Sequence, residues 1–270
     1  MKLRIFGSRG SAVFSRNTSY GGNTTCMVLE SKDNMIVLDA GSGLMGVDMD
    51  LRERYPGYPN SLPFEATVLI SHLHLDHVIG LPWFAPFFSP KVKSKIYTYD
   101  RGGGALRDQI FGSFVPPYWP VSMAAISSVE CLPIDGPFET NGFTVTPFVA
   151  NHPDKTASFH ITDGKKTLVY LLDNEMQPGY DRTEIIERCR NADLVVFDAA
   201  YLIEDYPGKI GWGHATVEDG IQLAEASGLK RMVFSHYAQE YPDHKLNLLN
   251  ERVPDDGRFI FAREGMTIEL

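Results

Sequence analysis

Short apolar runs separated by turn residues dominate the first third of the chain. They occupy residues 3–6, 25–30, 35–40 and 66–71, and Gly, Asn, Asp or Ser bounds each run. β-branched and apolar runs of this length, bounded in this way, are typical of strands. One helix is predicted from about 44 to 55, ahead of the Pro- and Gly-rich turn PGYP.

The second half of the chain repeats this pattern. Strands are predicted near residues 143–150, 157–162, 167–172, 193–198 and 231–235. Helices are predicted near 181–190 and 216–227, and Asp163-Gly164 favours a hairpin turn. Because strands outnumber helices and the helices fall singly between strand groups, we expect two strand-rich halves packed on each other, with helices outside.

A single domain over residues 1–270 is predicted, with a loop-rich insertion at about 80–130. In that segment LPWFAPFFSP and FVPPYWP concentrate proline and aromatic residues without clear periodicity. Hydrophobic residues make up 43% of the chain and charged residues 22%, a balance that supports a large core. We expect the aromatic side chains of the insertion to serve the core or a dimer interface rather than to stack a base, and a homodimer is left open.

Charge and cysteine content exclude several classes of protein. The formal net charge of -9 repels polyanions, so long nucleic acids are poor partners. No window approaches the roughly 18 apolar residues of a membrane helix, so no membrane partner is expected. Cys26, Cys131 and Cys189 are odd in number and far apart, which suggests neither a disulfide framework nor a thiolate zinc site. A cytoplasmic location is predicted.

The strongest chemical signal is the sequence His72-Leu73-His74-Leu75-Asp76-His77, directly after the predicted strand at 66–71. In an extended or turning loop, His72 and His74 point to one side, while Asp76 and His77 can turn toward a second point nearby. Imidazole nitrogens suit zinc, manganese, iron or nickel, and the carboxylate favours a hydrolytic centre. The alternative, four polar residues in a solvated loop, leaves this spacing unexplained.

The H-x-H-x-D-H motif after a buried strand resembles the metallo-β-lactamase superfamily, and the resemblance extends over essentially the whole chain. It implies an α+β fold, a four-layer αββα sandwich. It also implies three further metal ligands near strand ends, which are His152 in FVANHPD, Asp173 in LVYLLDNE and His236 in RMVFSHY. The implied centre holds two divalent ions, one on His72, His74 and His152, the other on Asp76, His77 and His236, with Asp173 shared. Zinc is the first choice for both ions, with manganese, iron or nickel as alternatives.

The stretch from 192 to 237 resembles the phosphodiesterase branch of the superfamily, which includes the tRNA 3′-processing endonuclease tRNase Z. An acidic residue at a strand end, a His-x-Thr before a helix and the last metal histidine follow in that order there. Asp198, His214 with Thr216, and His236 fill those places here. The acidic place usually holds a glutamate in tRNase Z, so Asp198 is a shorter side chain than that pattern has.

The resemblance implies that His214, oriented by Asp198, binds a phosphoryl oxygen and donates a proton to the departing alkoxide. Asp76 is counted with these catalytic residues as well as with the metal ligands. Thr216 is expected to cap the helix that begins at residue 217. The alternative is that His214 only packs in a Gly-rich turn and Asp198 only ends a strand. Asp39, after another strand, either accepts a hydrogen bond from a metal histidine or simply ends its strand.

Few residues separate His152 from Asp173 in the sequence, and this leaves no room for the flexible arm with which tRNase Z grips tRNA. A small substrate is therefore favoured. This spacing is similar to that of phosphoribosyl cyclic phosphodiesterases, and GSRGS, SYGGNTTCMVLES and LDAGSG resemble a bacterial cyclic-nucleotide-phosphodiesterase-like group. The predicted activity is hydrolysis of a small or cyclic phosphodiester by a metal-bridging hydroxide. A lactonase or thioesterase, a tRNase Z-like endonuclease and a non-hydrolytic metal-containing sensor are the alternatives.

Overall fold

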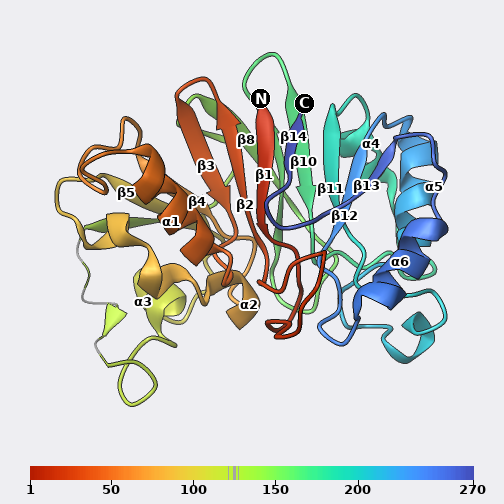
Figure 1. The fold of residues 1–270 in the computed structure, drawn as a ribbon, viewed down its shortest axis with the longest axis horizontal. Helices are drawn as coiled ribbons and strands as arrows, with labels where there is room; N and C mark the ends of the chain where they lie inside the picture. Colours follow the sequence, from red (N-terminus) through yellow and green to blue (C-terminus); the bar gives the residue numbers. More distant parts are fainter. Residues whose placement is uncertain (121, 124–125, 127) are drawn as a thin grey trace.

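The computed structural model describes residues 1–120, 122–123, 126 and 128–270 of the chain. Two seven-stranded sheets pack face to face, and helices cover the outer face of each sheet (Figure 1). Helices α1 and α3 lie outside the first sheet, and α4, α5 and α6 lie outside the second. The predicted α+β fold, a four-layer αββα sandwich, is therefore confirmed.

The first sheet has the strand order β14-β1-β2-β3-β4-β5-β6. Its strands are antiparallel from β14 to β3 and parallel from β3 to β6. The strands are β1 (Lys2–Gly7), β2 (Cys26–Ser31), β3 (Asn34–Leu38), β4 (Ala66–Leu69), β5 (Ser94–Thr98), β6 (Val129–Pro133) and β14 (Thr267–Glu269). The helical elements of this half are α1 (Leu44–Arg54), α2 (Leu75–Val78), η1 (Leu81–Trp83), η2 (Ala85–Phe88) and α3 (Leu106–Phe111).

The second sheet has the order β13-β12-β11-β10-β9-β8-β7. It is antiparallel from β7 to β10 and parallel from β10 to β13. In each sheet the pairing therefore changes from antiparallel to parallel at the central strand, which is β3 in the first sheet and β10 in the second. The strands are β7 (Phe138–Thr140), β8 (Phe143–Val149), β9 (Ala157–Thr162), β10 (Thr167–Leu171), β11 (Leu194–Asp198), β12 (Met232–Ser235) and β13 (Phe259–Phe261). The helical elements are α4 (Thr183–Cys189), η4 (Tyr206–Gly208), α5 (Val217–Ser227) and α6 (Asp243–Glu251).

Strand β2 shows why its sequence is an unbroken apolar run rather than an alternation. Met27 and Leu29 point into the core between the two sheets, whereas Cys26 and Val28 point into the core beneath α1. Successive side chains of a strand face opposite sides, so a strand with both faces covered needs apolar residues at every position. The predicted strands and helices of both halves are confirmed, with ends that shift by a few residues.

The segment from 80 to 130 contributes more to the fold than its irregular sequence suggests. Strand β5 pairs in parallel with both β4 and β6, so it lies inside the first sheet. Phe84 and Phe87 are buried, as expected of core residues, whereas Trp83, Phe88 and Tyr118 are exposed. Within the described part of the chain, every helix is too short or too polar to cross a membrane.

The carboxyl ends of the parallel strands position the candidate site. Asp39 follows β3, the His72–His77 motif follows β4, Asp173 follows β10, and His236 follows β12. Asp39, Asp173 and His236 adopt left-handed backbone conformations, with φ of 57°, 51° and 64°. Such conformations cost free energy in residues other than glycine and often mark functional sites, where the surrounding structure holds them. Each turns the chain sharply at its strand end.

Candidate metal centre

Four donor atoms form a compact cage at the carboxyl ends of β4, β10 and β12, which belong to both sheets. The Nε2 of His77 lies 3.2 Å from Asp76 Oδ2, 3.3 Å from Asp173 Oδ2 and 3.2 Å from the Nε2 of His236. The Nε2 of His236 lies 3.4 Å from Asp76 Oδ2 and 3.3 Å from Asp173 Oδ2. Ligands that surround one ion tetrahedrally at about 2.0 Å are separated by about 3.3 Å, so these distances fit a divalent metal site.

A second set of donors lies beside the first. His72, His74 and His152 offer ring nitrogens within 4.8 Å of one another, and the Nε2 of His72 lies 3.8 Å from Asp173 Oδ1. Thus Asp173 directs one carboxylate oxygen toward each set. The structure brings together all seven side chains that the resemblance implies as ligands.

Three donor atoms in these sets are buried without a hydrogen-bond partner. They are the Nε2 atoms of His72 and His152 and the Oδ2 of Asp173. A buried polar atom left without a partner costs roughly 1–3 kcal/mol, so native proteins rarely tolerate several in one place. A bound cation would give all three atoms a ligand bond, so the residues present fit metal binding.

Burial and nearby charges act in opposite directions on the pKa values of the candidate ligand histidines. Burial lowers the pKa of His72 and of His152, which favours the neutral imidazole that binds metal. Burial also disfavours a charged His77, but Asp173, Asp76 and Asp39 outweigh it and hold the pKa of His77 well above its usual value. Without a cation, the carboxylates therefore retain a proton on His77, and metal binding would release it.

Asp39 is the residue that orients His77. Its Oδ2 lies 2.9 Å from the Nδ1 of His77 and accepts a hydrogen bond of 2.8 Å from the Tyr170 hydroxyl. Its Oδ1 accepts a hydrogen bond of 2.7 Å from the Ser71 backbone N–H. A carboxylate that holds Nδ1 of a histidine fixes the ring so that Nε2 faces the metal. The geometry therefore favours the buttressing role for Asp39 over a simple strand end.

The structure pairs Asp198 with His214 at the edge of the cage. Asp198 Oδ2 lies 2.8 Å from the Nδ1 of His214, so the shorter aspartate reaches its partner. Asp198 is itself held by hydrogen bonds from the backbone N–H groups of Asp173 and Ala200, at 3.1 and 2.9 Å. The His214 ring stacks on His236 with centroids 5.0 Å apart. His214 therefore touches the donor cluster and is not merely packed in a turn.

The carboxylates around His214 favour its protonated form. Burial lowers the pKa of His214, but the charge and hydrogen bond of Asp198, with Asp173 and Asp76, raise it to about 9. The side chain also lies within reach of Asp173 and His236 as a third donor. His214 could therefore hold a proton or, in place of it, a cation.

Helix α5 begins three residues after His214 and has a capping box. The Thr216 hydroxyl accepts a hydrogen bond from the backbone N–H of Asp219, and the Asp219 carboxylate accepts one from the backbone N–H of Thr216. The prediction that Thr216 caps this helix is confirmed. The cap fixes the chain two residues beyond the His214 ring.

Sequence reasoning missed three contributors to the site, which are Gly10, Ser11 and Glu175. The backbone N–H of Ser11 donates a hydrogen bond of 2.7 Å to Asp76 Oδ2, and a Cβ on Gly10 would lie 2.5 Å from the His236 ring. The buried carboxylate of Glu175 holds the loop that precedes His214, through Gly211 and Gly213. The GSRGS sequence was noted only for its resemblance, and the position of Glu175 two residues after Asp173 carries no recognisable signal.

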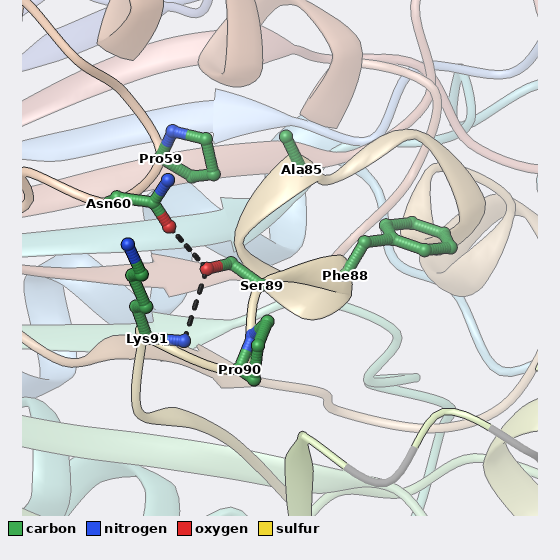
Figure 2. Close-up of a pocket in the computed structure, with 7 residues that line it drawn as sticks. All are labelled: Pro59, Asn60, Ala85, Phe88, Ser89, Pro90 and Lys91. Atoms are coloured by element: carbon green, nitrogen blue, oxygen red, sulfur yellow. Dashed lines mark hydrogen bonds between the residues drawn. The ribbon is translucent and has the colours of Figure 1, made fainter.

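A separate hollow of about 440 Å³ lies away from the donor cluster (Figure 2). It is lined by Pro59, Asn60, Ala85, Phe88, Ser89, Pro90 and Lys91. Ser89 donates a hydrogen bond to Asn60 Oδ1 and accepts one from the Lys91 backbone N–H, so the Ser89 hydroxyl is satisfied within the hollow. No imidazole or carboxylate is among the lining residues, so the hollow lacks the groups that bind metal or transfer protons.

Comparison with known proteins places the chain in a family. Residues 34–237 match the family described as beta-lactamase superfamily domain. A ribonuclease Z of Bradyrhizobium diazoefficiens is 22% identical over 274 residues, which cover 83% of this chain and 87% of that protein. The crystal structure of the metallo-beta-lactamase fold protein YhfI from Bacillus subtilis has a TM-score of 0.73 at 20% identity and covers 100% of this chain and 98% of that one.

A crystal structure described as a new diphosphatase from the PhnP family has a TM-score of 0.69 at 16% identity. It covers 100% of this chain and 97% of that chain. Likeness at this level of identity shows the shared fold, while the match to the family over most of the chain shows descent. The chain therefore belongs to the beta-lactamase superfamily, with the metallo-β-lactamase fold and the His/Asp clusters of a metal-binding hydrolase.

Proposed function

We propose that the chain is a metal-dependent phosphodiesterase that hydrolyses a small or cyclic phosphodiester. The observation that carries the proposal is the hydrogen-bonded pair of Asp198 and His214 at the edge of the donor cluster, 2.8 Å apart. Thioester hydrolysis does not need such a pair, because a thiolate leaves without a proton, whereas a phosphodiester expels an alkoxide, a poor leaving group. The pair supplies a proton at the place where that alkoxide would depart.

The donor sets would hold two divalent ions, with zinc as the first choice. His72, His74 and His152 would bind one ion, Asp76, His77 and His236 the other, and Asp173 both. Nitrogen and carboxylate donors at tetrahedral spacing suit zinc, and manganese, iron and nickel accept the same donors. When bound, such ions polarise a phosphoryl oxygen and make water a nucleophile at neutral pH.

His214 would act as the proton donor. Asp198 holds the Nδ1 of His214, so the second ring nitrogen, Nε2, is the one that can face a substrate oxygen. Asp198 favours the protonated form of His214, which can hydrogen-bond a phosphoryl oxygen before it donates its proton. Asp76 belongs to the catalytic set through its place between the two histidines of the cage.

The relatives support phosphorus chemistry, since they include a ribonuclease Z and a diphosphatase from the PhnP family. The structure supports a small substrate. Between His152 and Asp173 the chain forms only β9, a hairpin turn and β10. This stretch contains no projecting arm, and the formal net charge of -9 disfavours a long polyanion.

A tRNase Z-like endonuclease is the second candidate, because several curated relatives carry the name ribonuclease Z. It predicts binding of structured RNA with an affinity that falls steeply with salt concentration. The small-substrate proposal predicts instead that RNA does not compete with a small phosphodiester. The cytoplasmic location remains a prediction, in keeping with three cysteines that are free in the structure.

The test is hydrolysis of bis(4-nitrophenyl) phosphate by the purified protein loaded with zinc or manganese. We expect turnover. On 2′,3′-cyclic AMP, whose leaving group is an alkoxide, we expect His214→Ala to lose about 10²–10⁴ of kcat while its metal content stays at the wild-type value, and the loss on the nitrophenyl ester should be smaller because 4-nitrophenolate leaves without a proton. His244→Ala is the matched control, because His244 is exposed on α6. Robust turnover of a thioester or lactone with none of the phosphodiester would refute the proposal. An intense visible absorption band from redox-active iron, without any hydrolysis, would favour the metal-containing sensor.

A further inference from the structure

Trp212 is a large exposed aromatic side chain next to the metal centre, and the chemistry above does not use it. It is 55% exposed and lies two residues before His214. The intervening Gly213 packs directly on the donor cluster, since its carbonyl oxygen lies 3.2 Å from the Nδ1 of His152. A Cβ on Gly213, whose φ is +90°, would lie 1.9 Å from that nitrogen. The indole therefore stands at the rim of the site.

The loop that carries Trp212 is fixed on both sides of the indole. The buried carboxylate of Glu175 accepts hydrogen bonds from the backbone N–H groups of Gly211, at 2.8 Å, and Gly213, at 3.1 Å. It also accepts one of 2.7 Å from the Tyr206 hydroxyl. An aromatic ring held on an ordered loop loses little conformational entropy when a ligand stacks on it. Trp212 is therefore exposed on a loop that hydrogen bonds hold in place.

A row of side chains connects Trp212 to the proposed proton donor. The Nζ of Lys209 lies 4.2 Å from the Trp212 ring centroid and 5.4 Å from that of Tyr201. The Tyr201 ring in turn lies 5.7 Å from the His214 ring. The row therefore offers one cation and one exposed aromatic face beyond the reacting centre, a combination that binds an anionic group attached to a planar ring.

Room for such a group exists beside the row. A hollow of about 360 Å³ is lined in part by Phe14, Arg16 and Glu240. Glu240 connects this hollow to the row, since its Oε1 lies 3.7 Å from the Nζ of Lys209. Val13, another residue that lines the hollow, lies two residues after Ser11 in the sequence, and the backbone N–H of Ser11 contacts Asp76. A ring-bearing group that leaves the metal centre on this side would meet aromatic and basic side chains.

We propose that Trp212 is the binding platform for a planar ring in the substrate, a nucleobase or an aryl group, and that Lys209 accompanies it as the cationic partner. The inference rests on the proposed phosphodiesterase function and narrows it. The substrate is then a phosphodiester of a nucleoside or an aromatic alcohol, and not a phosphoribosyl diester that lacks a planar aromatic ring. Trp212 acts in binding and specificity, and it takes no part in the proton transfer.

The first experiment measures competitive inhibition of bis(4-nitrophenyl) phosphate hydrolysis by adenosine 5′-monophosphate and by ribose 5-phosphate. The two inhibitors share the phosphate and the sugar and differ in the base. We expect Trp212→Ala to raise the inhibition constant of the nucleotide about tenfold and that of the sugar phosphate less than twofold. Trp212→Phe, which keeps an aromatic ring, should restore most of the affinity. Trp83→Ala is the matched control, because Trp83 is also about half exposed, at 46%, and lies outside the site.

Two results would overturn the inference. One is an equal change in both inhibition constants on Trp212→Ala, and the other is a wild-type protein that binds the nucleotide no better than the sugar phosphate. A shift in oligomeric state on Trp212→Ala, with unchanged inhibition constants, would assign the indole to a subunit interface instead.

A binding measurement separates this inference from the proposed function. Stacking of adenine on Trp212 should quench the tryptophan fluorescence of the metal-loaded protein and of Trp83→Ala, and the quenching should vanish in Trp212→Phe. Ribose 5-phosphate should not quench. If nucleotide quenching occurs but no phosphodiester is hydrolysed, the proposed activity fails and the ring-binding site stands. If hydrolysis occurs and no quenching is seen, the ring-binding site fails alone.

Discussion

The two sheets contribute to the metal centre in different ways. The first sheet supplies His72, His74, Asp76 and His77 from one short segment after β4. The second sheet supplies single residues that follow separate strands or lie in loops between them, and these are His152, Asp173, Asp198, His214 and His236. A ligand set within six residues is local and needs only one loop to form. The dispersed set requires the whole second sheet to be folded, so metal binding and the packing of the two sheets are coupled.

The largest effect that tests this comparison is expected for Asp173→Ala. Asp173 is buried and directs one oxygen toward each donor set, so its removal affects both proposed metal sites at once. We expect at least one equivalent of metal to be lost and kcat to fall by more than about 10³. Metal content by mass spectrometry and the hydrolysis rate of bis(4-nitrophenyl) phosphate measure the two effects.

Asp135→Ala is the control for that experiment, because Asp135 is an exposed aspartate shortly after β6 in the other sheet. It should retain metal and activity. His74→Ala provides the counterpart from the contiguous motif and should lose less, because His74 belongs to only one donor set. If Asp173→Ala kept its full metal content, the shared role of Asp173 would be wrong, and the two sheets would hold metal independently.

The sequence predicted the two halves unequally well. The H-x-H-x-D-H spacing points to metal from chemistry alone, whereas each ligand of the second sheet is a lone His or Asp near a strand end. Such a residue is more often a cap than a ligand, and only the resemblance to a known superfamily singled these residues out. Most strands were predicted from their apolar runs, but β5, β6, β7, β13 and β14 were not. Strand β5 follows a proline-rich stretch, and β7, β13 and β14 are only three residues long.

Residues that act through backbone groups were beyond sequence reasoning. Glu175 accepts hydrogen bonds from the N–H groups of Gly211 and Gly213, and Ser11 donates its own N–H to Asp76. A backbone donor is present at every residue except proline, so its use leaves no mark on the sequence. Asp39 differs, because a carboxylate at a strand end is visible, and only the choice between two roles needed the structure.

A second test concerns the charge balance of the dispersed set in the metal-free protein. The pKa of His214 is raised to about 9, above its ordinary value of about 6.5, so the protonated form stabilises the fold. This contribution is fully present below pH 6.5 and is lost as the pH rises through about 9. We expect Asp198→Asn to remove it, so that the variant is less stable than the wild type by up to about 3 kcal/mol at pH 6.

Urea unfolding of the chelated wild type and of Asp198→Asn, at pH 6 and pH 9.5, measures this difference. The gap in unfolding free energy between the two proteins should narrow at the higher pH. Groups that do not contact Asp198 contribute equally to both proteins and cancel in the comparison. A gap that widens with pH would show that Asp198 does not stabilise a charged His214.

Asp39→Asn is expected to have a smaller effect, on the contiguous motif. An amide in place of the carboxylate removes the charge that orients His77. Because an amide has only one oxygen, it can no longer accept the hydrogen bonds of Ser71 and Tyr170 on two separate oxygens. Loss of such a supporting group typically lowers metal affinity about 10–100-fold. Competition with a fluorescent zinc chelator measures this affinity, and Asp33→Asn in the exposed β2–β3 turn is the control. An unchanged affinity would mean that the protein around His77 orients it without Asp39.

The smallest effect is expected from removing the N-terminal cap of α5, a feature in which the helices of the two halves differ. Helix α5 in the second half has the Thr216 capping box, whereas α1 in the first half begins at Gly43 with no side-chain cap. Thr216→Ala should lower the free energy of unfolding by about 1 kcal/mol, and Thr216→Ser, which keeps the hydroxyl, should restore most of it. Urea denaturation measures both values. Because the cap lies two residues beyond His214, the phosphodiesterase kcat of Thr216→Ala is also measured under conditions in which the variant is fully folded. A kcat below that of the wild type would then show that the start of α5 positions the proton donor. Equal kcat of Thr216→Ala and the wild type would show that the hydrogen bond to Asp198 is sufficient to position the His214 ring.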